Sequence, residues 1–296
     1  MNTAARITRW SWLPAALAGF FLWLGVAASA AAATRTWTGA AGDGKASTPG
    51  NWIPNGAPDD TDDILLDSTS SSNLTWDAAA TNLVASWLQT TGYAGTVTVA
   101  TVYYGKGTFT NFTIAGDCTI SNGVWTHRDN STTESNKLDL AVNGDLTVDS
   151  NGVIRADGLG YDTGYGPGAP QGGAAHGGSY GGIGGWHIGT PSSSLGGTYG
   201  SVITPTNIGS GGGNNGGVSG GGAIRVAVAG ALALNGTISA NGAGATRTGS
   251  GGSVYIRAST IGGGGIIRAN GGPGAEAGGA GGRVAVALSG GDFSAF

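Results

Sequence analysis

Four aspartates crowd into one short stretch of the sequence, and their chemistry suits a metal ion. They are Asp59, Asp60, Asp62 and Asp63, with Thr61 between the two pairs. Carboxylate and carbonyl oxygens are the ligands that Ca²⁺ prefers, so this stretch is a candidate calcium site. The alternative is an acidic turn whose charges keep an edge strand soluble. No other cofactor is expected.

Five aromatic residues in a glycine-rich segment are the candidate ligand-binding residues. They are Tyr161, Tyr165, Tyr180, Trp186 and Tyr199. Flat aromatic faces with polar tips suit glycans or the surface of a partner protein. Extracellular glycans or other surface proteins are therefore the expected partners. The alternative is that these rings pin a glycine-rich loop onto the rest of the fold.

Residues for catalysis are not evident in the sequence. Glycosidases use paired carboxylates about 5–10 Å apart, and a repeat protein would carry them at equivalent positions of neighbouring repeats. Here the repeat position occupied by Asp157 is occupied by Asn241 and Asn270 in later units. Glu276 is the only acid between residues 163 and 291. No serine stands in a nucleophile-elbow setting. We therefore expect no catalytic residues.

Composition excludes several classes of protein. Of the 61 glycines, 14 lie in residues 1–150 and 47 in residues 151–296, without a strict Gly-X-Y register, which excludes collagen. Charged residues make up only 10% of the chain, too few for a charged disordered protein. The net charge of −4, without any run of Lys or Arg, argues against nucleic acid as a partner.

The first 30 residues have the pattern of a secretory signal peptide. Two arginines precede an apolar stretch at residues 12–26, and Ala28-Ser29-Ala30 fits the small-x-small cleavage rule, with a second site at residues 31–33. The alternative is an uncleaved anchor, but the apolar stretch is short of the ~20 residues of a membrane span. We expect an exported protein, extracellular or at the cell surface, with no transmembrane span after cleavage.

A repeat of 30 residues organises the C-terminal half. Segments 224–228, 254–258 and 284–288 alternate apolar residues with others, and each follows a Gly-Gly pair. Segment 138–142 opens an earlier unit of the same kind. Alternation with period two predicts strands, and a fixed period predicts stacked units that bury their apolar faces against one another.

Two sets of residues carry structural predictions of their own. Asp157, Asn241 and Asn270 fall at one position of the repeat, each before a glycine, and predict a ladder of stacked turn side chains. Cys118 is the single cysteine, so an internal disulfide is excluded. We expect Cys118 to be a small buried residue in a strand.

The pattern resembles exported bacterial β-helix proteins, including autotransporter passengers and adhesin-like surface proteins. The resemblance implies a right-handed β-helix at the cell surface and no particular chemistry. It rests on Thr36-Trp37-Thr38-Gly39, Asn51-Trp52, Pro58 and Asp63-Ile64-Leu65, on Gly282-Arg283-Val284-Ala285-Val286, and on the Ile-x-Ala-Asn-Gly corners.

The predicted fold class is all-β: a single-stranded right-handed β-helix, or β-solenoid, with coils of about 30 residues and a long glycine-rich loop insertion. The last unit stops in the middle of a coil without a polar cap, so we expect a fragment of a longer protein. The predicted divisions are a signal peptide at 1–30, an N-terminal capping block at 31–76, first β-helix coils at 77–158, a glycine-rich excursion with the aromatic residues at 159–222, and β-helix repeats at 223–296.

The function expected from the sequence is a structural or adhesive role in a secreted or cell-surface β-helix protein, including glycan binding and without catalysis. One alternative is a polysaccharide-active β-helix enzyme, either a lyase or a glycoside hydrolase. Another is the passive stalk of a larger surface protein. Glycan binding without turnover would separate the first from the other two.

Overall fold

The computed structural model describes residues 32–100, 111–213 and 216–296, and the predicted signal peptide lies outside them. Residues 32–296 group into one compact unit. The fold is all-β, as predicted, with parallel sheets. No helix in the described ranges has the length and apolar character needed to cross a membrane.

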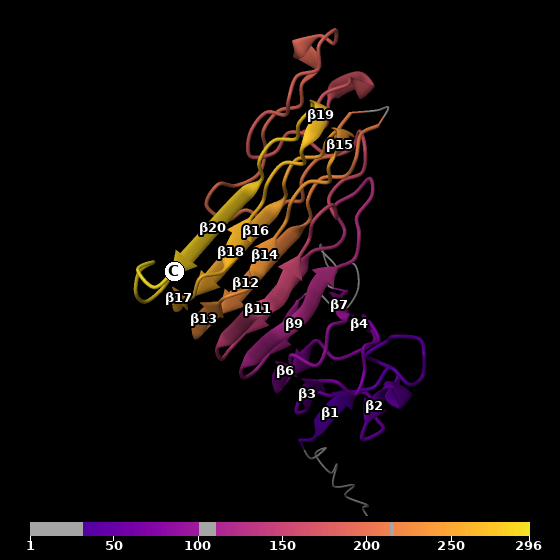
Figure 1. Cartoon of the computed structure of the whole chain (residues 1–296), viewed down its shortest axis with the longest axis vertical. Coiled ribbons are helices and arrows are strands. Elements are labelled where there is room, and N and C mark those ends of the chain that lie inside the picture. Colours follow the sequence, from indigo (N-terminus) through magenta and orange to yellow (C-terminus); the bar gives the residue numbers. More distant parts are fainter. Residues whose placement is uncertain (1–31, 101–110, 214–215) are drawn as a thin grey trace, which may run out of the picture. The chain divides into compact units, whose positions relative to one another are not determined.

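The strands form three sheets (Figure 1), and in the described residues every pairing is parallel except that of the first two strands. The largest sheet has twelve strands: β1 (Thr34–Trp37), β2 (Trp52–Ile53), β3 (Asp63–Leu66), β4 (Leu74–Trp76), β6 (Ser86–Gln89), β7 (Thr96–Val99), β9 (Cys118–His127), β11 (Leu146–Arg155), β13 (Ala231–Leu234), β14 (Thr237–Ser239), β17 (Thr260–Gly262) and β18 (Ile266–Arg268). The six-stranded sheet contains β5 (Leu83–Val84), β8 (Phe112–Ile114), β10 (Leu138–Val142), β12 (Ala223–Val228), β16 (Ser253–Ala258) and β20 (Arg283–Leu288). The third sheet pairs β15 (Ala245–Arg247) with β19 (Gly274–Ala277), and short 3-10 turns occur at Pro49–Asn51, Gln171–Gly173 and Ser192–Ser194.

The six-stranded sheet has the register that the repeat predicts. Ile224 of β12 pairs with Val254 of β16, which pairs with Val284 of β20, 30 residues further on each time. Leu138 of β10 pairs with Ile224 across the long excursion. The parallel pairing also continues back through β8 to β5, inside the segment 77–158 for which the first coils were predicted. Figure 1 shows β12, β16 and β20 side by side.

Inward side chains of the two large sheets meet in one apolar core. In β12, the inward Val226 is fully buried while the outward Arg225 is partly exposed. The same core takes Leu140 and Ile256 from the six-stranded sheet and Val148 from the larger one. Cys118 is also buried in this core, without a disulfide partner, as predicted. Burial raises the pKa of its thiol, so it behaves as a small apolar residue.

The N-terminal part of the core is a column of indole rings. Trp37, Trp52, Trp76, Trp87 and Trp125 are buried, and successive ring centroids lie 5.0, 6.1, 5.4 and 4.8 Å apart. Each successive pair meets edge to face, the arrangement that the ring quadrupoles favour. The residues of the predicted capping block therefore share one core with the strands that follow.

Stacked glycines make the corners of the repeat. The amides of Gly222 and Gly252 donate to the carbonyl oxygens of Ala156 and Ala240, 2.7 Å away in both cases, and Gly282 repeats the contact one unit later. A Cβ on Gly252 would run into the carbonyl oxygen of Gly222. The 30-residue recurrence of glycine is thus required by the close approach of successive backbones.

Side-chain oxygens link successive turns in ladders. The backbone N–H of Asn241 donates to Asp157 Oδ1 at 2.7 Å. The backbone N–H of Asn270 donates to Asn241 Oδ1 at 2.8 Å. The predicted ladder is therefore confirmed. The sequence did not suggest a second ladder of the same kind. In it, the backbone N–H of Asp145 donates to Asp117 Oδ1, and the backbone N–H of Ala231 donates to Asp145 Oδ1.

The glycine-rich excursion at 159–222 contains no strand among its described residues, yet its backbone is extensively hydrogen-bonded. The successive amides of Gly220, Gly221 and Gly222 donate to three different segments, at Tyr161, Ser250 and Ala156. Amides of a strand would alternate between two neighbours, whereas an extended segment with three residues per turn presents them to three. Around Gly220 to Gly222 the excursion is therefore an extended glycine segment hydrogen-bonded to three neighbouring segments.

Candidate ligand-binding face

The most buried acid of the predicted calcium site is already fully engaged. Asp62 accepts a hydrogen bond from Arg35 Nε at 2.8 Å and another from the Ala33 amide at 3.0 Å. It also accepts from the Asp59 amide at 3.1 Å. Its carboxylate thus closes a turn against β1 and is not directed toward its acidic neighbours.

The other three acids of that stretch also diverge. Asp59 accepts from the amide and hydroxyl of Thr61, and these hydrogen bonds lower its pKa. Asp63 accepts from the Ser86 hydroxyl, and Asp60 is exposed. Within the described residues, no group of three or more His, Cys, Asp or Glu side chains is placed to hold a metal ion. The predicted calcium site is not assembled, because each acid but Asp60 serves a local turn or strand contact.

Three of the five predicted aromatic ligand-binding residues pack against the rest of the fold, with Tyr199 partly buried. Tyr161 and Tyr180 are buried, and the Tyr180 hydroxyl lies 2.7 Å from that of Ser253. The Tyr199 ring packs 4.5 Å from that of Tyr180, between centroids, and the Arg283 guanidinium lies 5.4 Å from the Tyr180 centroid. Tyr180 and Tyr199 anchor the excursion to β16 and β20, and Tyr161 packs with Ile208 and Ala223 of β12. The three rings are therefore engaged in contacts within the fold.

The remaining two aromatic residues are on the surface. The side chains of Tyr165 and Trp186 are 49% and 51% exposed. The Trp186 indole donates to the Thr190 carbonyl oxygen at 2.6 Å, which fixes the ring against its own loop. The structure therefore does not bring the five predicted residues together as one site, because burial of the anchoring rings separates their roles.

Outward side chains of the six-stranded sheet form two rows across four strands. Because neighbouring strands lie about 4.8 Å apart, residues in one row are near neighbours. We call the surface formed by these rows the outer face. One row is Asp139, Arg225, Tyr255 and Ala285, and the other is Ala141, Ala227, Arg257 and Ala287.

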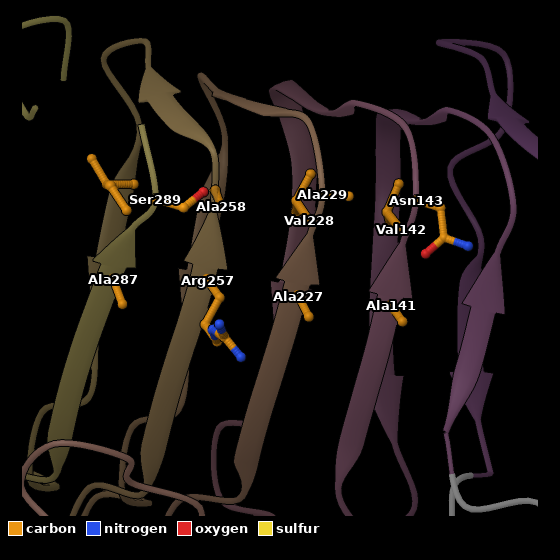
Figure 2. Close-up of a pocket in the computed structure, with 11 residues that line it drawn as sticks. Ala141, Val142, Asn143, Ala227, Val228, Ala229, Arg257, Ala258, Ala287 and Ser289 are labelled. Carbon is orange, nitrogen blue, oxygen red and sulfur yellow. The ribbon is translucent and has the colours of Figure 1, made fainter. Parts of the chain in front are cut away.

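A trough of about 330 Å³ lies on the outer face, toward the C-terminal ends of these strands. Figure 2 shows Ala141, Ala227, Arg257 and Ala287 on successive strands, with their side chains on the same side of the sheet. The three alanines make a low floor, and Arg257 stands above it. The exposed Arg257 guanidinium has no hydrogen bond or ion pair within the described residues, so its donors face solvent.

A smaller pocket of about 190 Å³ lies toward the N-terminal ends of β10 and β12. Arg225 Nη1 lies 2.9 and 3.1 Å from the two carboxylate oxygens of Asp139. Burial raises the pKa of Asp139, while Arg225 and Lys137 act in the opposite direction. Lys137 and the excursion residue Thr206 complete the polar lining. The pocket therefore combines cations, a carboxylate and a hydroxyl in one small space.

The period-two alternation of the repeat strands predicts that Arg225, Tyr255 and Arg257 face outward, but nothing in the sequence singles them out as a site. Lys137 and Thr206 were missed altogether. The signal that could have found the rows was the outward position of each strand, read across repeats at the predicted register. Thr206 left no such signal, because it belongs to the excursion, which has no period.

No family model, no curated protein and no solved structure matches this chain. The case for a function therefore rests on the residues and geometry of the outer face.

Proposed function

We propose that this chain is an exported, right-handed β-solenoid surface protein whose outer face binds an extended glycan, in an adhesive role and without catalysis. The signal-peptide pattern supports export, and the 30-residue parallel register supports a solenoid. The observation that carries the proposal is the outer face, where Tyr255 and two arginines stand in register over an alanine floor.

The geometry of this face suits a long, flat polymer. Parallel strands present equivalent positions about every 4.8 Å, so an extended chain crossing the strands meets the same kind of contact repeatedly. The Tyr255 ring offers an apolar face for stacking against a sugar ring. Arg257 supplies hydrogen-bond donors for hydroxyl or charged groups. Alanines at the neighbouring outward positions leave room for the polymer to lie close to the backbone.

The proposal is tested by measuring the binding of the mature chain to a glycan panel, with product analysis of the same mixtures. We expect binding to at least one extended glycan without any release of reducing ends or unsaturated uronides. Tyr255→Ala should weaken that binding by about 3- to 10-fold, since aromatic contacts contribute roughly 0.5–1.5 kcal/mol.

Tyr165→Ala is the matched control, because it removes another surface tyrosine from the predicted aromatic set. Its affinity should equal that of the wild type. If Tyr165→Ala lost binding and Tyr255→Ala did not, the site would lie on the excursion instead of the outer face. Turnover of the bound glycan would favour the enzyme alternative, and absence of all glycan binding would favour a passive stalk.

A further inference from the structure

The pocket at the N-terminal ends of β10 and β12 carries information about the charge of the ligand. Three separate parts of the chain build it: Lys137 and Asp139, then Ala223 to Arg225, and Thr206 from the excursion. Glu134 holds the excursion segment that contains Thr206 in place. Its carboxylate accepts hydrogen bonds from Asn207 Nδ2 and from the Ile208 backbone N–H, both at 3.2 Å. The pocket is thus a built feature of the fold and does not depend on one mobile side chain.

Cationic and acidic side chains meet at this pocket. Lys137 and Arg225 contribute two positive charges and Asp139 one negative charge, while the whole chain has a net charge of −4. Lys137 Nζ also lies 2.7 Å from Glu134 Oε1, an ion pair that fixes the ammonium group beside the pocket. Arg257, on the same face, adds a third cation over the trough. Because Glu134 offsets the charge of Lys137, the excess of positive charge on the outer face comes from Arg225 and Arg257 against Asp139, and it attracts anions.

Arg225 is the group best placed to bind such an anion. Within the described residues its guanidinium bonds to Asp139 through Nη1 alone. Nη2 and Nε therefore keep their donors, and a guanidinium edge of this kind matches the two oxygens of a planar carboxylate. The Arg225 side chain is 43% exposed, so a ligand can reach it.

Tyr255 connects this pocket to the binding surface of the proposed function. It is the direct neighbour of Arg225 in the row across β12 and β16. A sugar stacked on the Tyr255 ring would place its own substituents, or those of the next sugar, at the guanidinium. Asp139 and Thr206 are then available to bond ring hydroxyls, since a carboxylate accepts and a hydroxyl both donates and accepts.

We infer that the pocket binds the carboxylate of a sugar acid through Arg225, so that the glycan recognised by the outer face is a uronic-acid polymer. This inference rests on the proposed function and specifies its ligand class. Arg225 donates to the two carboxylate oxygens, Asp139 orients the guanidinium and bonds ring hydroxyls, and Arg257 adds attraction from the neighbouring row.

The test compares matched ligands that differ only in charge. Oligogalacturonate and oligomannuronate are each titrated beside their carboxyl-reduced forms, by calorimetry, at two salt concentrations. We expect the wild type to bind at least one acidic form about tenfold or more tightly than its reduced partner, in line with a charge-assisted hydrogen-bond pair. The preference should shrink at higher salt.

Variants assign the preference to the pocket. Arg225→Gln should bring the acidic and reduced forms within about threefold of each other, and Arg225→Lys should keep part of the preference because it keeps the charge but loses the planar fork. Arg155→Gln removes an exposed arginine of β11, in the other large sheet, and should leave the preference unchanged. Circular dichroism and the urea midpoint of each variant show that it is folded.

The outcomes separate this inference from the proposed function. Equal affinity for the acidic and reduced forms, or tight binding of only sulfated glycans, would overturn the inference and leave glycan binding in place. A preference that survives in Arg225→Gln would overturn the assignment to this pocket. Absence of binding to every glycan tested would overturn both.

Discussion

His127 illustrates how the fold fixes the protonation state of one buried residue. Its Nδ1 lies 2.6 Å from the Arg128 carbonyl oxygen, and its Nε2 lies 3.3 Å from the Ala223 amide nitrogen. A carbonyl oxygen only accepts and an amide only donates. The ring is therefore neutral, with its proton on Nδ1, and burial lowers the pKa of His127 to about 4.

At this residue we expect acid to destabilise the protein. Between pH 6.5, the ordinary pKa of histidine, and about pH 4, the unfolded chain binds a proton at His127 that the folded chain does not. The free energy of unfolding should therefore decrease as the pH is lowered through this window, by an amount on the order of 3 kcal/mol. Urea midpoints measured from pH 7 to pH 4 check this.

His127→Gln should flatten the pH dependence in that window, whatever its effect on stability at pH 7. Gln keeps an amide donor and a carbonyl acceptor but does not titrate. A variant whose stability falls with pH as steeply as that of the wild type would show that other groups cause the loss.

At the scale of single elements, the corners between strands set the repeat. Two adjacent glycines mark each corner in the sequence, but the last described corner differs from the earlier ones. A Cβ on Gly252 would meet backbone oxygens of the preceding unit, whereas a Cβ on Gly281 would have no atom within 4 Å. A Cβ on Gly251 would meet the Gly282 amide of the following unit, and Gly281 has no such following unit among the described residues. Both glycines of a corner are therefore constrained only where a further unit stacks on it.

We therefore expect unequal effects from two similar substitutions. Gly252→Ala should lower the free energy of unfolding by about 1–3 kcal/mol, the usual cost of forcing a methyl group into a packed site. Gly281→Ala should change it by less than about 0.5 kcal/mol, as exposed substitutions usually do. Urea denaturation of both variants measures the difference, and equal losses would contradict the stacked-corner explanation.

At the scale of the whole molecule, one core joins the N-terminal tryptophan column to the aliphatic repeats, without any disulfide within the described residues. Burial falls off at the last strand of the six-stranded sheet. Val254 of β16 is fully buried, but the equivalent Val284 of β20 is 45% exposed. The reason is that β20 has a neighbour on one side only among the described strands. Stability therefore depends on each strand layer having another layer against it.

Export of the whole chain is a separate prediction, made from the sequence. In a bacterial secretion host we expect cleavage after Ala30, so that the intact mass of the exported protein corresponds to a chain starting at Ala31. Replacing Ala28 and Ala30 together by Phe should abolish this product, since the cleavage site requires small side chains. A chain exported without cleavage, or one still starting at Ala31 in the double variant, would contradict the prediction.

The sequence by itself determined the periodic features of this protein. Strand alternation, the 30-residue register, the Asp157–Asn241–Asn270 ladder and the buried Cys118 were all predictable, because each follows from local spacing or from repetition of one unit. The inward and outward sides of the repeat strands were predictable for the same reason.

The tertiary structure alone decided which functional groups meet. Thr206 of the excursion lines one pocket with Asp139 and Arg225, and no repeat in the sequence predicts that it meets them. Asp62 pairs with Arg35 and not with a shared metal site, and Tyr180 is buried against β16. Such pairings depend on what lies across the sheet or under a loop, and local spacing does not encode that information.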